Sequence, residues 1–298
     1  MSPAAEALAA APGRAGGSAA RIRLRRLANV SGWVGCGLFF ALVALPLFDL
    51  LALIAVRGFG AFRASLFTTV TNGISGGLLN AITGTLVLSG GALLFGVPVG
   101  VGGGIYLAEF GRGRFADLVR FLADVLTGIP SIVLGYFSYI TMVIGLGWQF
   151  SVLAGAITVA IIIVPYIARI SELALRQVPQ TLGEAAYAIG APEHTVVLRI
   201  VFPVAWPGIL TGILLGLAIS VGETAPLIYT AGWSNYLWNG RLTHEPVGYL
   251  TYVVWSFINQ PFASAHALAF AAALLVILAV LAINIASRLA LRRRAGGT

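Results

Sequence analysis

The sequence predicts an all-α polytopic membrane protein with six transmembrane helices, and three observations support this fold class. Hydrophobic residues make up 59% of the 298 residues and charged residues only 9%, whereas a soluble domain carries about 25% charged residues. The apolar residues arrive in long runs instead of amphipathic stripes. The arginines fall between these runs, mostly at alternate connections. Because so few charged residues cannot form a water-soluble surface, we expect lipid to surround these helices.

Six segments are long and apolar enough to cross a hydrocarbon core of about 30 Å, which needs roughly 20 residues per helix. We expect them at about 31–56, 79–108, 118–146, 151–170, 207–231 and 264–286. The third segment is interrupted by Asp124 and by the stretch 127–131, which contains Pro130. We therefore expect its crossing part to begin near Ser131.

The distribution of arginines predicts which face of the membrane the termini occupy. With six spans both termini share one face, and that face carries fifteen of the 18 basic residues: Arg14, Arg21, Arg23, Arg25, Arg26, Arg112, Arg114, Arg120, Arg169, Arg176, Arg199, Arg288, Arg292, Arg293 and Arg294. The other face carries Arg57, Arg63 and Arg241. Because cytoplasmic loops are enriched in basic residues, we expect a multi-pass inner-membrane protein with both termini in the cytoplasm.

The two ends of the chain differ in composition from the middle. We expect residues 1–30 to form a disordered basic cytoplasmic tail, because the first twenty are rich in Ala, Gly, Pro and Ser. Residues 31–290 then form a six-helix transmembrane domain, and residues 291–298 a second basic cytoplasmic tail. The arginine clusters near both ends indicate topology signals and lipid contact, not nucleic-acid binding.

The connection between the fourth and fifth spans, residues 171–206, is the longest structured loop on the arginine-rich face. Residues 181–189 are typical of a short helix, and Gly190 suits a left-handed position after it. Pro192 and Glu193 suit the first turn of a second helix. A loop this long in a compact membrane protein usually has a function, although a simple connection between two spans stays open.

The spacing within this loop resembles a known signature. Glu184, Ala185 and Ala186 are followed at fixed intervals by Gly190, Ile200 and Pro203. This pattern is similar to the E-A-A-x3-G-x9-I-x-L-P motif of bacterial ABC importer permeases, with Phe202 where leucine is usual. The resemblance implies a type I ABC importer permease architecture. It also implies that these six residues couple the chain to an ATPase subunit.

Further motifs resemble the PstA-type permeases of bacterial phosphate importers, within the binding-protein-dependent transport family. They are G-V-P-V-G from Gly96, I-Y-L-A-E from Ile105, G-I-P-S-I-V-L-G from Gly128, V-P-Y-I-A-R from Val164, Q-V-P from Gln177 and G-E-T-A-P from Gly222. The resemblance implies four partners: a PstC-like second permease subunit, two PstB-like ATPase subunits and a PstS-like phosphate-binding protein that is periplasmic or lipid-anchored. Inorganic phosphate is then the expected substrate.

Glu223 is the most informative residue inside the predicted spans. A carboxylate near the bilayer middle costs at least about 2.5 to 3.5 kcal/mol, so it should face the bundle interior and have a partner. Gly222 and Pro226 are expected to loosen the helix around it. We expect Arg169 to be its cationic partner and place both residues in the substrate pathway, together with the hydroxyls of Ser220 and Thr224. The alternatives are a structural carboxylate and an interfacial anchor.

One position departs from the phosphate permeases that the chain resembles. Those proteins commonly carry an arginine four residues before the motif glutamate, where this sequence has Ile219. A dianion needs positive charge or oriented backbone N–H groups. Molybdate or sulfate therefore stays open as the substrate, and a membrane-embedded enzyme or a channel stays open as the class.

The sequence also indicates which chemistry to expect elsewhere. All basic residues are arginine, so the lysine of a phosphate-binding loop is missing. We expect no catalytic residue, cofactor site or metal site in this chain, with ATP and magnesium bound by a partner ATPase. Residues 233–261 are rich in Trp, Tyr and Asn and are expected to form an outer loop at the membrane interface that docks the binding protein.

Overall fold

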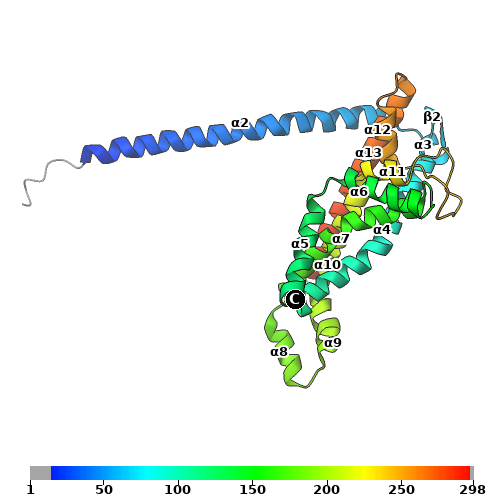
Figure 1. Ribbon diagram of the computed structural model, residues 1–298. Coiled ribbons are helices and arrows are strands. Elements are labelled where there is room, and N and C mark those ends of the chain that lie inside the picture. The colour runs from blue at the N-terminus through cyan, green and yellow to red at the C-terminus, as the bar shows by residue number, and fades with distance from the viewer. Residues whose placement is uncertain (1–14, 296–298) are drawn as a thin grey trace, which may run out of the picture. The chain divides into compact units, whose positions relative to one another are not determined.

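The computed structural model describes residues 15–295, which are helical apart from one short hairpin and the connecting loops (Figure 1). The hairpin pairs β1 (Thr71–Asn72) with β2 (Ser75–Gly76) in antiparallel register. The α-helices are α2 (Ala15–Ala61), α3 (Ser65–Thr68), α4 (Leu79–Ile105), α5 (Arg114–Gly128), α6 (Ser131–Ser138), α7 (Val152–Arg176), α8 (Gln180–Ala188), α9 (Glu193–Thr195), α10 (Phe202–Gly222), α11 (Ala225–Thr230), α12 (Leu250–Phe257) and α13 (Ala263–Ala295). Three π-helical segments are η1 (Tyr106–Phe110), η2 (Tyr139–Gly145) and η3 (Val196–Val201).

The described helices agree with the predicted number of spans. Five of them are long and apolar enough to cross a membrane, and the bent pair α5 and α6–η2 gives a sixth if it is counted as one span. That pair bends by 99° at Ile129 and Pro130. The interruption expected there is therefore confirmed, and α6 begins at Ser131 as predicted.

The chain divides into two compact units, residues 1–53 and 54–298. In the first unit, helix α2 begins at Ala15. The expectation of a disordered tail over residues 1–30 is therefore wrong for 15–30, and residues 1–14 lie outside the described part. The physical reason is that the segment before the apolar run is rich in Ala, Arg and Leu, which favour a helix and extend it without a break.

In the second unit, small residues let the long helices pack closely. Gly100 and Gly104 of α4 face Ile167 and Ser171 of α7, and a Cβ on either glycine would lie within 3 Å of those side chains. Helix α10 packs on α7 in the opposite direction, with Gly208 facing Ala174 and Gly216 facing Ile167. Without a hydrophobic drive between helices in lipid, such close approach is what stabilises a bundle.

Two predicted boundaries change in the structure. The fifth span, expected over 207–231, is broken after Gly222, and α11 follows as a separate short helix. The expected loop 171–206 is shorter, because α7 extends to Arg176 and α10 begins at Phe202. At the far end α13 extends to Ala295, so residues 291–295 are helical, and 296–298 lie outside the described residues.

Residues 233–261 are not simply a surface loop. They contain α12, and Tyr249, Leu250 and Val253 are buried in the core of the second unit. Trp233 stacks on Tyr252 with ring centroids 4.7 Å apart. Some aromatic residues of this segment therefore pack into the core. The sequence did not predict α12, because eight residues are too few to be recognised as a helix from periodicity.

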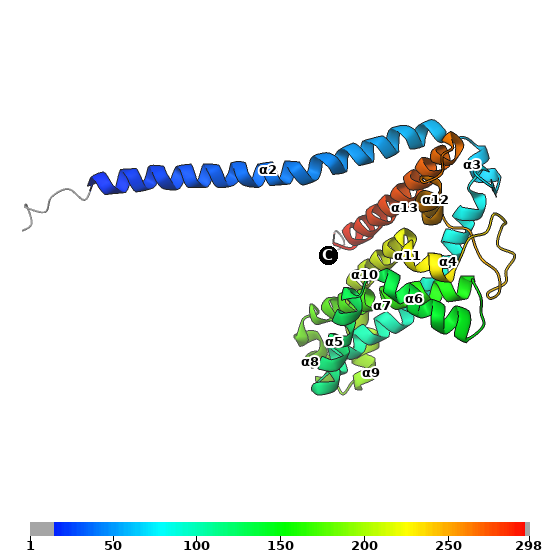
Figure 2. The same ribbon diagram turned by 45° about the horizontal axis from the view of Figure 1, so that its top comes forward.

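Figures 1 and 2 show the arrangement of the second unit. In both views α8 and α9 project at one end, while α3, the hairpin and α12 lie at the other end. Helices α4, α7 and α10 run between these ends.

Candidate functional site

The loop between α7 and α10 folds into a helix, a turn and a second helix. The turn after α8 has Gly190 at φ +82°, so the predicted left-handed position is confirmed. The N–H of Gly190 donates to the Tyr187 carbonyl at 2.9 Å, and the N–H of Ala191 donates to the Ala186 carbonyl at 3.1 Å. These bonds satisfy carbonyls that the end of α8 leaves without helical partners. Pro192 then precedes α9, which begins at Glu193 as expected.

The two halves of this loop pack on each other around a small core. Ala186 of α8 is buried with Val196 and Val201 of η3 and with Leu175 at the end of α7. Ile200 packs against the same core and is partly buried. The loop is therefore one folded body joined to α7 on one side and α10 on the other, so that a displacement of the loop moves both helices.

The six residues of the signature divide by exposure. Glu184, Ala185, Gly190 and Pro203 are exposed, whereas Ala186 is only 5% exposed. The methyl group of Ala186 fills the loop's own core, so this residue is not part of the outer surface of the loop. The coupling role of these residues stays a prediction.

The outer surface of the loop carries apolar side chains that the sequence reading did not single out. Ile189 lies beside the Gly190 turn and is 86% exposed, and Leu182, Tyr187 and Leu198 are also exposed. Several large apolar side chains exposed on one folded loop favour a protein contact surface. The loop therefore offers a partner apolar surface in addition to the exposed signature residues.

A buried carboxylate at the end of α7 is the largest omission from the sequence reading. The Glu172 side chain is 3% exposed, and its Oε1 lies 2.9 Å from Arg120 Nε and 3.0 Å from Arg176 Nη2. Its Oε2 lies 3.4 Å from Arg169 Nη1. The spacing of Arg169, Glu172 and Arg176 by three and four residues on one helix is the signal that could have indicated this cluster.

The same arginines connect neighbouring segments. Arg120 of α5 donates to the Leu107 carbonyl of η1 at 3.0 Å and to Asp117 at 3.2 Å. Arg176 donates to the same Leu107 carbonyl at 3.2 Å. The cluster therefore ties α5, η1 and α7 together immediately before the chain enters the loop.

The expected pairing of Arg169 with Glu223 is wrong. Arg169 pairs with Glu172, and because α10 runs antiparallel to α7 with Gly212 facing Ile170, Glu223 lies about ten residues farther along. That spacing corresponds to roughly 15 Å along the helix axis, too far for an ion pair. The place of Arg169 in a substrate pathway stays a prediction, supported by a guanidinium that is about half exposed.

Glu223 lies at the break between α10 and α11. Its backbone is extended (φ −68°, ψ 134°), and Thr224 follows at φ −126° and ψ −59° before Pro226 opens α11. The loosening expected from Gly222 and Pro226 is therefore confirmed. The Thr251 hydroxyl donates to the Glu223 carbonyl at 2.6 Å, which satisfies a backbone group that the break exposes.

Two of the sequence motifs meet at this break. Ser131 of α6 lies near the Glu223 side chain. Gly135 packs so closely on Pro226 that a Cβ there would lie 2.5 Å from the Pro226 Cα. The P-S-I-V-L-G stretch of α6 and the G-E-T-A-P stretch thus form one site, although they lie some ninety residues apart in the sequence.

A small polar cavity of about 10 Å³ adjoins Glu223. Ser89 and Tyr249 line it, and within the described residues their hydroxyls have no hydrogen-bond partner. A volume of this size holds about one water molecule. Ser220 also lines the cavity, but its hydroxyl donates to the Leu217 carbonyl of its own helix at 2.9 Å. No arginine or lysine is among the residues that line it.

The remaining predicted pathway residues lie close to the break. Thr224 precedes the first turn of α11 and is partly buried. Ile219, one turn before Glu223, packs against the core between α4 and α7. The structure therefore brings Ser220, Glu223 and Thr224 together and leaves Arg169 apart from them.

Comparison with known proteins identifies the family of this chain. The family model of the binding-protein-dependent transport system inner membrane component matches residues 100–296. The chain belongs to this family. It is a multi-pass inner membrane component of such a transport system, with the helices described above.

Relatives of this inner membrane component extend over most of its length. It is 44% identical over 265 residues to the phosphate transport system permease protein PstA 2 of Mycobacterium bovis, covering 89% of this chain and 88% of the relative. It is 42% identical over 236 residues to the permease protein PstA of Yersinia pestis, covering 78% and 79%. The predicted resemblance to PstA-type permeases is confirmed.

A solved structure supports the fold of this inner membrane component. A chain of the MetNI methionine ABC transporter in an inward-facing conformation matches with a TM-score of 0.62 at 21% identity, covering 72% of this chain and 95% of that chain. The expected type I importer permease architecture is confirmed at the level of the fold.

Proposed function

We propose that this chain is one of two membrane-spanning permease subunits of an ATP-driven importer that carries inorganic phosphate across the inner membrane by alternating access. The observation that carries this proposal is the 44% identity, over 89% of the chain, to a relative named a phosphate transport system permease. Both the loop signature and the Glu223 break lie within the residues that match the family.

The proposed partners follow from the family and from the loop. A PstC-like permease completes the pathway, and two PstB-like ATPase subunits bind ATP and magnesium. A PstS-like binding protein delivers the anion. The exposed cluster around Ile189 is the surface we propose for one ATPase subunit. We place this loop and both termini in the cytoplasm, because that face carries fifteen of the 18 arginines.

The proposed mechanism uses the packing within the chain and no covalent chemistry. Closure of the ATPase pair moves the loop, whose core joins it to α7 and α10. The Glu172 cluster makes α5 follow α7 as a single body. The break at Glu223 and Thr224 lets the end of α10 change direction relative to α11. Such breaks lie at the binding sites of other transporters.

The charge of the transported anion requires a contribution from another subunit. The cavity beside Glu223 has no cationic lining residue, and Ile219 stands at the position where the resemblance to phosphate permeases leads us to expect an arginine. A dianion needs cations or oriented N–H groups. We propose that the second permease supplies the cation and that Glu223 orients it.

Uptake of labelled phosphate tests this proposal in cells that contain the complete importer and no other phosphate transporter. We expect Glu223→Gln and Arg169→Ala to lower uptake at least tenfold, roughly the effect of one lost charge-assisted contact. Asp124→Asn serves as the control, because Asp124 is exposed on α5 and forms no ion pair within the described residues. Unchanged uptake in both variants would remove Arg169 and Glu223 from the pathway.

Competition identifies the substrate. Arsenate should compete with phosphate, whereas sulfate and molybdate should not, because arsenate shares the shape and protonation of phosphate. Competition by molybdate or sulfate alone would favour the alternative oxyanion that Ile219 leaves open. Phosphate uptake without ATP would favour a channel.

A further inference from the structure

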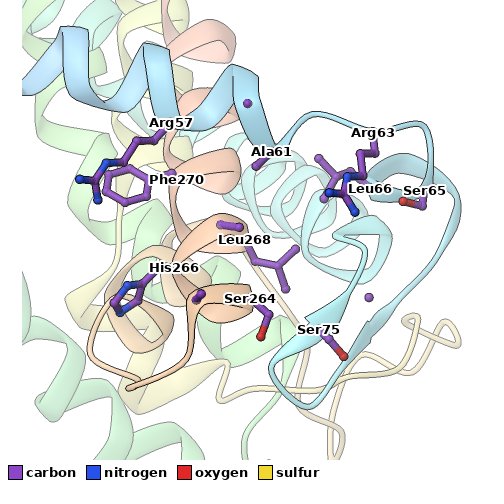
Figure 3. A pocket seen from close by; sticks show the side chains of 14 residues that line it. Arg57, Ala61, Arg63, Ser65, Leu66, Ser75, Ser264, His266, Leu268 and Phe270 are labelled. Atoms are coloured by element: carbon purple, nitrogen blue, oxygen red, sulfur yellow. The ribbon is translucent and has the colours of Figure 1, made fainter.

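A cavity has no role in the proposed transport cycle and lies at the opposite end of the second unit from the loop between α7 and α10, which we call the coupling loop. Its volume is about 730 Å³, and it lies between the end of α2, α3, the hairpin and the first turn of α13 (Figure 3). All its lining residues belong to the unit 54–298. It is far larger than the cavity beside Glu223.

The lining of this cavity is basic. Arg57, Arg63 and His266 line it, and no aspartate or glutamate does. In the part of the chain that the structure describes, neither arginine forms an ion pair. Arginines near a carboxylate are usually paired with it, so two arginines that share a cavity without an acid leave positive charge for a ligand.

One of these arginines is held in place by an aromatic ring. The Arg57 guanidinium lies 5.2 Å from the centroid of the Phe270 ring, and Figure 3 shows the two side by side. Stacking of this kind occupies the face of the guanidinium and leaves its N–H edge available. Arg63 lies on another side of the cavity, near Leu66.

Neutral donors complete the lining. Ser65 and Ser264 contribute hydroxyl groups, whereas the Ser75 hydroxyl donates to the Asn72 carbonyl at 3.1 Å. Ala263 and Ser264 belong to the first turn of α13, a helix of 33 residues, and the first N–H groups of a helix have no helical acceptor. Guanidinium groups, hydroxyls and a helix start together form the set of donors that binds phosphate oxygens in proteins.

The rest of the cavity wall is apolar. Leu66, Leu268 and Phe270 line it beside the charged residues. A lining that combines charged and apolar side chains matches a phosphate group attached to a hydrocarbon chain, and its charged part alone matches a free anion. We propose that this cavity binds a phosphate group, carried either by an anionic phospholipid or by inorganic phosphate. The proposal does not depend on the transport function or on Glu223.

Binding to the full chain, purified in mild detergent with the subunits that accompany it, tests the proposal. Retention of phosphatidylglycerol, measured by mass spectrometry against phosphatidylcholine, tests the lipid source. Equilibrium binding of labelled inorganic phosphate to lipid-depleted protein tests the free anion. In each arm the wild-type chain is compared with Arg63→Gln and with the double variant Arg57→Gln and Arg63→Gln.

We expect one probe to bind Arg63→Gln severalfold more weakly than the wild-type chain and the double variant at least about tenfold more weakly, the effect of losing a hydrogen bond to a charged group. Arg241→Gln is the matched control, because Arg241 is on the same predicted face but does not line the cavity. Arg63→Gln keeps the contact between Arg57 and Phe270, so it retains the fold if the double variant does not. Equal binding of both probes to wild-type and Arg63→Gln protein would overturn the proposal.

Discussion

Two carboxylates inside the same bundle have opposite surroundings. Glu172, at the end of α7, is buried among Arg120, Arg169 and Arg176. Glu223, at the break after α10, has no ion-pair partner within the described residues and lies near Ser131. The first is committed to holding segments together, whereas the second is free to take a partner that arrives from outside the chain.

The helices around the two carboxylates also differ in how firmly they are held. Near Glu172 the arginines connect α5, η1 and α7 to one another, immediately before the coupling loop. Near Glu223 the helix is interrupted, and a cavity the size of one water adjoins it. In the proposed mechanism, the rigid region around Glu172 transmits the displacement of the loop, and the loosened region at Glu223 allows the helices to rearrange.

The largest expected difference in stability is between two single variants, in which either Glu172 or Glu223 is replaced by glutamine. Glu172→Gln should lower the free energy of unfolding by about 1.5 to 3 kcal/mol, because three arginines lose the buried carboxylate that they share and Arg120 keeps only the exposed Asp117. Glu223→Gln should change it by less than about 1 kcal/mol, because no ion pair is lost. Unfolding in SDS, followed by circular dichroism, measures both. Equal losses of stability would show that Glu223 is also a structural ion.

A methyl group at Gly135 tests how tightly the loosened region is packed. Gly135→Ala should cost about 1 to 3 kcal/mol, because the new Cβ would meet the Pro226 backbone and force α6 away from α11. Gly90→Ala is the matched control, because nothing lies within 4 Å of a Cβ at that position of α4. The same unfolding experiment measures both, and equal stability of the two variants would contradict the close contact.

Substitutions at Gly190, in the turn of the coupling loop, test the rigid region. Gly190 has φ +82° and open space around a Cβ, so a substitution acts through the backbone conformation alone. Gly190→Val should cost about 1 to 2 kcal/mol, whereas Gly190→Asn should be tolerated, since asparagine adopts this conformation readily.

The ratio of ATP hydrolysed to phosphate taken up distinguishes a mechanical role for this turn from simple instability. We expect the ratio to rise in Gly190→Val while the complex still assembles, because the angle between α8 and η3 changes. In Gly190→Asn the ratio should stay at the wild-type value. A normal ratio in the valine variant would refute the coupling role.

The hydrogen bond at the break gives the smallest expected effect. Thr251→Val keeps the shape of the side chain but removes the donor to the Glu223 carbonyl, which should cost about 1 kcal/mol. Thr68→Val, at an exposed threonine, should cost less and serves as the control. The midpoint of thermal unfolding in detergent compares the two, and identical midpoints would show that water replaces the Thr251 hydroxyl.

The sequence predicted those features of the fold that depend on a few neighbouring residues. Apolar runs predicted the spans, Gly190 predicted the left-handed turn, and Gly222 with Pro226 predicted the interruption of the helix. Each of these depends on the conformational preference of a few neighbouring residues. The helix boundaries shifted mainly where a run of good helix formers continued beyond the apolar segment, as at the start of α2.

The pairing of side chains was not predictable in the same way. Arg169 was assigned to Glu223, and the true partner lies three residues away on the same helix. The contribution of Arg120 comes from α5, and it depends on how that helix bends at Pro130. Likewise, α12 packs inward because Thr85 accepts a hydrogen bond from the Leu250 N–H, a contact between residues 165 positions apart.

The exposed Ile189 at the tip of the loop affects the chain before it ever transports anything. A subunit made in excess of its partners presents this side chain, with Leu182, Tyr187 and Leu198, to the surrounding water. Uncovered apolar projections are what chaperones and quality-control proteases bind. The lifetime of an orphan subunit should therefore depend on how soon a partner covers this tip, which links the amount of this chain to the supply of the other components.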